Sequence, residues 1–231
     1  MRQILLLLRH PEKEDDLDGI YRGHEAKITE RGLRQVEAVT SMLVDLQIDA
    51  ILSSALMRTG LMAAHIADRL QRPVTIEPLL NELDKPKHLI GKRYDHPEAR
   101  ALMQEHRDRF DEDHVPEGSG LQSRSMLEQE MRDLFTRIER MPQHRILAVT
   151  HAKRIAACRH WVYKGERTLE GYYREADRTL LIENTDIFVL IRQPDRRTGE
   201  PHWHIGSLES LRRADDGLFD SALLDSLAAK A

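Results

Sequence analysis

An uninterrupted run of aliphatic residues near the start of the chain constrains its fold. The run "ILLLL" (residues 4–8) shows no alternation between apolar and polar positions, and it leads directly into Arg9 and His10. A strand of this kind is buried on both faces, as in parallel sheets that have helices packed on either side. Its carboxyl end lies at the edge of the sheet where ligands bind in open α/β folds. The run therefore predicts an α/β fold with Arg9 and His10 at the ligand-binding edge.

A second stretch of the chain ends in the same way. In "RILAVTHAKRIAA" (145–157), a short apolar run stops at Thr150 and His151 and is followed by residues with helical spacing. If the two strands are parallel neighbours, their carboxyl ends meet at one edge of the sheet. We therefore expect His10 and His151 to lie close together.

The rest of the chain alternates between strand and helix patterns. We expect helices over 29–46, 55–70 and 121–140, strands over 49–54 and 73–78, and an antiparallel hairpin formed by 186–191 and 202–208 at one side of the sheet. Thr29 is the expected N-cap of the first of these helices. The apolar positions of that helix are Leu33, Val36, Val39, Leu43 and Leu46. The alternation predicts a three-layer α/β/α sandwich with a mostly parallel central sheet and an antiparallel edge strand.

The length of 231 residues fits one domain. We assign residues 1–210 to this domain and treat the polar stretch at about 84–119 as an insertion over the sheet edge. Residues 211–231 have apolar positions at helical intervals and form a predicted C-terminal helical extension. This extension either packs on its own domain or docks on a second subunit of a homo-oligomer.

Composition narrows the classes of partner and site. The net charge of −4 provides no general attraction to nucleic acid or to an anionic membrane. The single cysteine, Cys158, excludes an internal disulfide framework, and the apolar start is too short for a signal peptide or membrane span. We therefore expect a cytoplasmic protein. His202 and His204 share one face of a predicted strand, but no third ligand follows at a suitable spacing, so no metal or other cofactor is expected.

Further polar residues follow the other predicted strands. Arg58 lies near the start of a helix after "ILSS", and Glu82 follows the third strand in "LLNEL". The candidate site thus contains Arg9, His10, Arg58, Glu82 and His151. Guanidinium groups bind phosphate oxygens, a neutral imidazole is a good nucleophile toward phosphorus, and a carboxyl group can protonate a leaving oxygen. The residue types favour phosphoryl transfer.

Five segments together resemble the histidine phosphatase superfamily, the phosphoglycerate mutase-like branch 1. In chain order they are "LLLLRHPE", "YRGHEAKITERGLRQVEAV", "SSALMRTGLMAAHIA", "LLNEL" and "AVTHAKRI". The resemblance covers roughly residues 3–210 and implies a phosphoglycerate mutase-like fold. It also implies that His10 is the nucleophile that forms a phosphohistidine, with Glu82 as proton donor.

The same resemblance assigns the phosphate-binding residues. It implies that Arg9, Arg58 and His151 hold the phosphoryl oxygens, with Arg22 as a weaker candidate and His151 also counted among the catalytic residues. The activity implied is that of a metal-independent phosphatase that acts on phosphate monoesters, either small phosphorylated molecules or a phosphoprotein.

Two alternatives stay open at this point. A phosphoglycerate mutase-type phosphotransferase is disfavoured because the insertion after Glu82 is short. Pro11 and Ala152 replace the glycines that usually follow the two histidines, which leaves open a pseudophosphatase that binds phosphate or a partner without turnover. Several basic residues after Glu82 either read the rest of an anionic substrate or belong to a solvated loop: Lys85, Lys87, His88, Lys92 and Arg93.

Overall fold

The computed structural model describes residues 2–22, 26–165, 167–175, 181–195, 198–209 and 211. Apart from Leu211, the predicted C-terminal extension lies outside these ranges. The strands are β1 (Gln3–Arg9), β2 (Ala50–Ser53), β3 (Val74–Ile76), β4 (Arg145–Thr150), β5 (Ile187–Pro194) and β6 (Pro201–Gly206). The helices are α1 (Glu14–Asp18), α2 (Glu30–Leu43), α3 (Met57–Leu70), α4 (Pro97–Asp108), α5 (Arg124–Arg140), α6 (Ala152–Lys164) and α7 (Tyr172–Glu175), with short 3-10 turns η1 (Val44–Leu46), η2 (Pro78–Leu80), η3 (Lys87–Leu89) and η4 (Phe110–Glu112).

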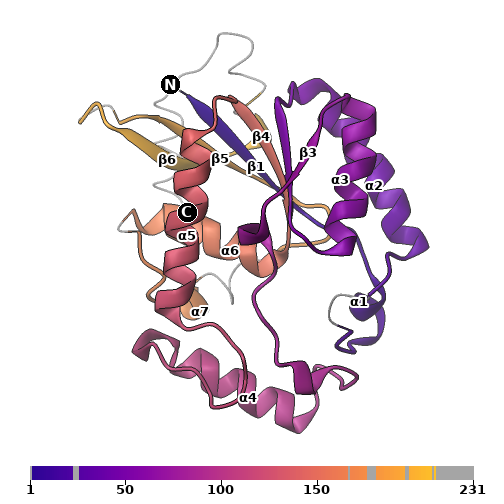
Figure 1. Cartoon of the computed structure of the whole chain (residues 1–231), viewed down its shortest axis with the longest axis vertical. Helices are drawn as coiled ribbons and strands as arrows, with labels where there is room; N and C mark the ends of the chain where they lie inside the picture. Colours follow the sequence, from indigo (N-terminus) through magenta and orange to yellow (C-terminus); the bar gives the residue numbers. More distant parts are fainter. Residues whose placement is uncertain are drawn as a thin grey trace.

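The strands form one mixed sheet in the order β3-β2-β4-β1-β5-β6. Strands β3, β2, β4 and β1 pair in parallel, whereas β5 is antiparallel to β1 and β6 is antiparallel to β5. This arrangement confirms the mostly parallel sheet with an antiparallel hairpin at one side (Figure 1).

The aliphatic run in β1 is buried on both faces of the sheet, as predicted. Ile4, Leu6 and Leu8 pack with residues of α2 and α3, whereas Leu5 and Leu7 pack with residues of α5 and α6. Burying each side chain of this size contributes about 1.5–3 kcal/mol, so a strand without polar positions is stable only between two helical layers. These contacts explain the three-layer sandwich.

Helix α2 begins where the sequence predicts, and it supports the loop that follows β1. The Thr29 side chain caps the helix by accepting a hydrogen bond from the Gly32 amide, and its hydroxyl donates to Glu12 Oε1 at 2.7 Å. A Cβ atom at Gly32 would lie 2.3 Å from the Glu12 carbonyl oxygen. Only glycine therefore allows this close approach between the start of α2 and the loop that carries His10.

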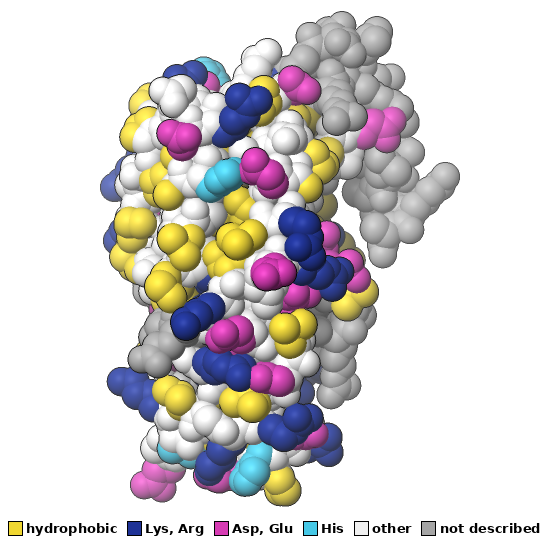
Figure 2. Space-filling view, turned by 90° about the vertical axis from the view of Figure 1, so that its right-hand side faces the viewer, with side chains coloured by type: hydrophobic (Ala, Val, Ile, Leu, Met, Phe, Trp, Pro, Cys, Tyr) yellow, Lys and Arg dark blue, Asp and Glu magenta, His cyan; other side chains and the backbone are white. Residues whose placement is uncertain are grey.

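One residue of the predicted apolar face of α2 is placed differently. Leu33 is 59% exposed because its side chain points away from the sheet. With Met57 and Leu61 it lines a surface groove of about 660 Å³ between α2 and α3. Figure 2 shows apolar side chains gathered on this face of the molecule. Leu33 is thus an apolar position of the predicted helix that does not pack on the sheet.

Helix α5 starts at Arg124, three residues after the predicted start at Leu121, because the Ser123 side chain caps it. The predicted insertion holds η3, α4 and η4, and α4 lies beyond the carboxyl ends of the parallel strands (Figure 1). The buried His106 of α4 bonds through Nε2 to the Gln122 carbonyl at 2.9 Å, which fixes α4 beside the start of α5. Within the described ranges, no helix is long and apolar enough to cross a membrane.

Candidate active site

The two histidines are brought together by the pairing of β1 with β4. Arg9 pairs with Thr150 at the end of the parallel ladder, so the next residues, His10 and His151, leave the sheet side by side. Their ring centroids are 5.1 Å apart, and both side chains are buried. The expectation that both imidazoles lie at one edge of the sheet is confirmed.

His10 is held in one tautomer by the residue that follows it. Its Nδ1 lies 2.7 Å from the Pro11 carbonyl oxygen. Because a carbonyl only accepts hydrogen bonds, Nδ1 carries the proton and Nε2 keeps its lone pair. Burial, followed by the positive charge of Arg58, holds the pKa of His10 well below its ordinary value. The imidazole is therefore neutral at neutral pH, and Nε2 has the lone pair of a nucleophile.

His151 is held in the other tautomer. Arg58 Nη2 lies 3.1 Å from His151 Nδ1, and Ser54 Oγ lies 2.9 Å from His151 Nε2. A guanidinium only donates, so Nδ1 accepts and Nε2 of the neutral ring donates to Ser54. Ser54 Oγ is in turn 2.6 Å from Thr59 Oγ1. Burial, then the Arg58 charge, lowers the pKa of His151 well below its ordinary value.

Arg58 comes from the first turn of α3 and is 5% exposed. Its Nε and Nη1 groups have no hydrogen-bond partner among the described residues. Burial lowers the pKa of Arg58, and the negative charge of Glu82 offsets this more than any other charge does. Buried donors without partners are costly, so an anion that accepts from them would be stabilised.

Arg9 lies at the end of β1 and is partly fixed by the surrounding chain. Its Nη1 donates to the Ile182 carbonyl at 2.6 Å, and its Nη2 is 3.7 Å from Asp16 Oδ1. The Arg9 Nε group is buried with no partner in the described part of the chain. Its charge acts on His10, where it contributes to the lowered pKa.

Glu82 is half-buried in the loop after η2, where its Oε1 accepts from the Leu83 amide at 3.1 Å. Its negative charge favours the charged forms of both Arg58 and Lys85. The structure thus gathers the five candidate residues at the carboxyl end of the sheet: Arg9, His10, Arg58, Glu82 and His151.

Arg22 is engaged elsewhere. Its Nη1 donates to Asp18 Oδ1 at 2.7 Å, and its guanidinium also lies near Asp15 and Glu14. These carboxylates, Asp18 first, raise the pKa of Arg22. A contact between Arg22 and phosphate stays a prediction and would require this pairing with Asp18 to break.

Sequence reasoning missed Lys13 as part of the site. Its side chain is buried, with Nζ 3.1 Å from Asp15 Oδ2 and 3.5 Å from Asp16 Oδ1, and its charge contributes to the lowered pKa of His10. Lys13 stands in a run of charged residues that is typical of a solvated loop. The sequence therefore does not indicate that Lys13 is buried beside Asp15 and Asp16, which only the structure shows.

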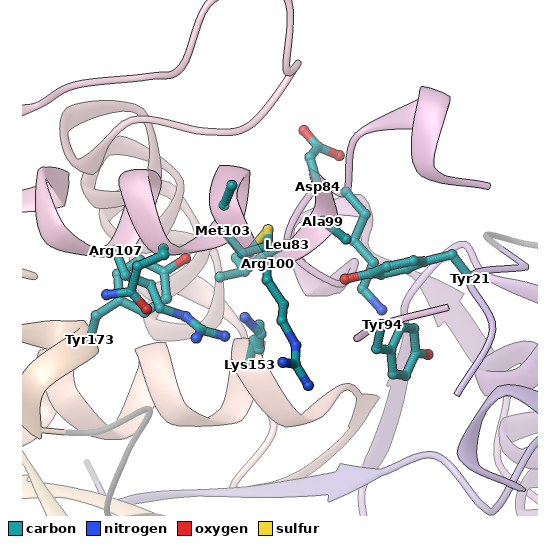
Figure 3. A pocket seen from close by; sticks show the side chains of 13 residues that line it. Tyr21, Leu83, Asp84, Tyr94, Ala99, Arg100, Met103, Arg107, Lys153 and Tyr173 are labelled. Carbon is teal, nitrogen blue, oxygen red and sulfur yellow. The ribbon is translucent and has the colours of Figure 1, made fainter. Parts of the chain in front are cut away.

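A cavity of about 570 Å³ is lined by Leu83, the residue after Glu82, and by Lys153, two residues after His151. Its walls come from the loop after Glu82, from α4, and from the region of α6 and α7 (Figure 3). The lining residues are Tyr21, Leu83, Asp84, Lys85, Tyr94, Ala99, Arg100, Ala101, Met103, Gln104, Arg107, Lys153 and Tyr173.

Of the basic residues that follow Glu82, Lys85 lines the cavity, whereas Lys87, His88, Lys92 and Arg93 do not. Lys85 lines the cavity with its Nζ 5.3 Å from the ring centroids of both Tyr21 and Tyr94. Solvent reaches Lys85, yet protein surrounds it on most sides, and this burial lowers its pKa to about 8. Lys92 pairs with Glu98 and Arg93 pairs with Asp95 outside the cavity. Of these residues, Lys85 is therefore the one whose position suits a substrate contact.

His202 and His204 are the two histidines that share one face of a strand outside the candidate site. His202 and His204 lie on β6 with ring centroids 5.0 Å apart. In the part of the chain that the structure describes, no three or more His, Cys, Asp or Glu side chains are grouped so that they could hold a metal ion.

Solved structures with this fold include several phosphatases. Mycobacterial glucosyl-3-phosphoglycerate phosphatase in complex with VO3 is 20% identical with a TM-score of 0.70, covering 88% of this chain and 97% of that chain. Phosphoserine phosphatase from Entamoeba histolytica in complex with phosphoserine is 21% identical with a TM-score of 0.68, covering 91% and 98%. The alpha-ribazole phosphatase from Shigella flexneri is 22% identical with a TM-score of 0.63, covering 89% and 95%. At these identities the likeness establishes the fold.

Sequence comparison finds a related phosphatase and a matching protein family. The adenosylcobalamin/alpha-ribazole phosphatase of Escherichia coli (strain K12) is 36% identical over 80 residues, which is 34% of this chain and 39% of that relative. The model of the histidine phosphatase superfamily (branch 1) matches residues 5–198, a range that contains Arg9, His10, Arg58, Glu82 and His151. This chain belongs to the histidine phosphatase superfamily, branch 1.

Proposed function

We propose that this protein is a metal-independent phosphatase that hydrolyses phosphate monoesters through a phosphohistidine intermediate on His10. The observation that carries the proposal is the state of His10. Its Nδ1 proton is bound by the Pro11 carbonyl, so the lone pair of Nε2 remains available beside the buried guanidinium donors of Arg58. The fold shared with three phosphatases and the family membership support it.

In the first step, His10 Nε2 attacks the phosphorus atom and a nitrogen–phosphorus bond forms as the ester oxygen–phosphorus bond breaks. Arg9 and Arg58 hold the phosphoryl oxygens, and their charge and hydrogen bonds stabilise the transition state. A contact from His151 to a phosphoryl oxygen requires one of its present hydrogen bonds, to Ser54 or to Arg58, to break. Glu82 acts as the general acid, giving a proton to the leaving oxygen and becoming the carboxylate. The alcohol then leaves, and the phosphoryl group stays on His10.

In the second step, water attacks the phosphohistidine. A new oxygen–phosphorus bond forms, the Glu82 carboxylate takes a proton from the water, and the electron pair of the broken nitrogen–phosphorus bond returns to Nε2. The products are inorganic phosphate and neutral His10. The arginines supply the positive charge that a metal ion supplies in metal-dependent phosphatases, so we expect full activity in EDTA.

The natural substrate is a small phosphorylated molecule under this proposal, because the cavity beside Glu82 has a size that suits a small-molecule leaving group. A phosphoprotein remains the other class of substrate for this site. Screening purified protein with a panel of phosphomonoesters and phosphopeptides would separate the two.

The test is turnover of p-nitrophenyl phosphate together with acid- and base-quenched samples. We expect release of inorganic phosphate and a phosphoryl group on His10 that survives base and is lost in acid. A His10→Ala variant should lose both, whereas His65→Ala should keep both because His65 pairs with Glu37 on the surface. Binding of vanadate without any hydrolysis would instead identify a pseudophosphatase, and transfer to a second substrate without phosphate release would identify a mutase.

A further inference from the structure

Lys85 connects the cavity electrostatically with the candidate site, since its charge acts on His151 and the charge of Glu82 acts on Lys85. Leu83, Asp84 and Lys85 line the cavity and directly follow Glu82 in the chain. Lys153 lines it from the first turn of α6, two residues after His151. Because Glu82 protonates the leaving oxygen in the proposed mechanism, the rest of the leaving group extends toward this cavity.

The cavity concentrates positive charge within a protein whose net charge is −4. Four of its lining side chains are cationic, namely Lys85, Arg100, Arg107 and Lys153, and one is a carboxylate, Asp84. In Figure 3 the carboxylate of Asp84 points away from the side chains of Arg100, Arg107 and Lys153. An anionic ligand bound among these cationic side chains is therefore stabilised.

The arginines of α4 lie on one face of the helix. Arg100 and Arg107 are seven residues apart, which places them two turns apart along the helix, about 10 Å by its rise per residue. In Figure 3 the side chain of Arg107 ends to the left of Lys153, and that of Arg100 passes to its right. Lys153 also lies 5.5 Å from the ring centroid of Tyr173.

Aromatic rings and apolar side chains form much of the remaining wall. Tyr21 and Tyr94 form an edge-on pair with centroids 4.3 Å apart, and Tyr173 contributes a third ring. A volume of about 570 Å³ lies within the range of sites that hold drug-sized ligands. A leaving group as small as the side chain of an amino acid would leave most of this space unfilled.

We propose that the substrate is a phosphomonoester whose leaving group is large, contains a flat ring system, and ends in a second anionic group. The arginine pair of α4, together with Lys153, holds the second anion, and the tyrosines cover the ring system between the two anions. This inference rests on the proposed phosphatase activity and names its substrate class.

Two synthetic substrates test the inference directly. Biphenyl-4,4′-diyl bisphosphate is symmetric, so either end presents the same phosphate to His10, and biphenyl-4-yl phosphate lacks only the distal anion. We expect kcat/KM for loss of the first phosphate to be at least about tenfold higher for the bisphosphate, with most of the difference in KM.

Arginine variants test whether the arginines of α4 cause the preference for the bisphosphate. Arg100→Gln and Arg107→Gln should each bring the ratio of the two kcat/KM values toward one. Arg109→Gln removes the same charge just beyond α4, where Arg109 pairs with Glu112 at 2.8 Å, and should keep the ratio of the parent. A ratio near one in the parent, or an unchanged ratio in both α4 variants, would overturn the inference.

Failure of the proposed phosphatase activity can be distinguished from failure of the anion site. If neither biphenyl ester nor p-nitrophenyl phosphate is hydrolysed, the phosphatase proposal fails. Calorimetric titration with the matching biphenyl bisphosphonate and monophosphonate then tests the cavity alone. Tighter binding of the bisphosphonate that Arg100→Gln removes would support the anion site, and equal binding of the two would reject it.

Discussion

The ring centroids of His10 and His151 lie 5.1 Å apart, and the two rings are protonated at different nitrogens, Nδ1 in His10 and Nε2 in His151. The Pro11 carbonyl fixes the first tautomer, and the Arg58 guanidinium fixes the second. The two imidazoles therefore differ in chemical role although both come from strand ends of the same sheet. One presents a lone pair at Nε2, and the other is bound at both of its nitrogens.

The tautomers can be observed directly. At pH 7.5, nitrogen-15 chemical shifts of the phosphate-free protein should show His10 protonated at Nδ1 and His151 protonated at Nε2. The neighbouring oxygens and the Arg58 donor require these states. Spectra in which both rings carry the proton at the same nitrogen would contradict the hydrogen bonding described above.

The role of Glu82 depends on the leaving group of the ester. In a Glu82→Gln variant, turnover of an alkyl phosphate should fall by about a hundredfold or more, because the alkoxide needs a proton as it leaves. Turnover of p-nitrophenyl phosphate should fall much less, because p-nitrophenolate leaves without a proton. Parallel kcat measurements on both esters decide the matter, and equal slowing would assign a structural role to Glu82.

Pro11 replaces the glycine that the family resemblance leads one to expect. Proline has no N–H, but it keeps the carbonyl that orients His10, at 2.7 Å from Nδ1. A Pro11→Gly variant should therefore keep kcat within about tenfold of the parent, a barrier change of about 1.4 kcal/mol. A gain of several hundredfold would show that proline had disabled the site and would favour the pseudophosphatase.

The buried histidines also make stability depend on pH. Burial and Arg58 lower the pKa of both rings in the folded state, whereas the unfolded chain has ordinary values near 6.5. The stability that comes from this difference is fully present above about pH 6.5 and is lost as the pH falls toward the lowered pKa.

Urea unfolding between pH 7.5 and pH 5 tests this linkage. The free energy of unfolding should decrease more steeply with falling pH in the parent than in a His10→Asn variant, in which one titrating group is gone. Carboxylates contribute equally to both proteins over this range. The same slope in both would mean that His10 does not titrate with a lowered pKa.

Much of the sheet and the position of its histidines follow from local patterns. The run in β1 and the shorter run in β4 have no polar positions, which is sufficient to predict burial between two layers. The polar residues that end such strands must lie at the same edge when the strands are parallel. This is why His10 and His151 could be placed together from the sequence.

The cavity could not be predicted in this way. Tyr21 and Tyr94 meet because the Tyr21 amide donates to the Lys92 carbonyl at 2.9 Å, a contact between loops that are far apart in the chain. The position of α4 likewise depends on the bond between His106 and the Gln122 carbonyl. The exposure of Leu33 could not be predicted either, because helical periodicity alone does not tell which apolar residues of a helix the sheet covers.

The pairing of β1 with β4 has a consequence for biosynthesis. His10 is made before the strand that sets His151 beside it, which spans Arg145–Thr150. The parallel ladder cannot form until β4 has left the ribosome, and such long-range pairing is slow compared with helix formation. A nascent chain therefore leaves the aliphatic run of β1 without its β4 partner until β4 has been made, and it gains the paired histidines only when the centre of the sheet closes.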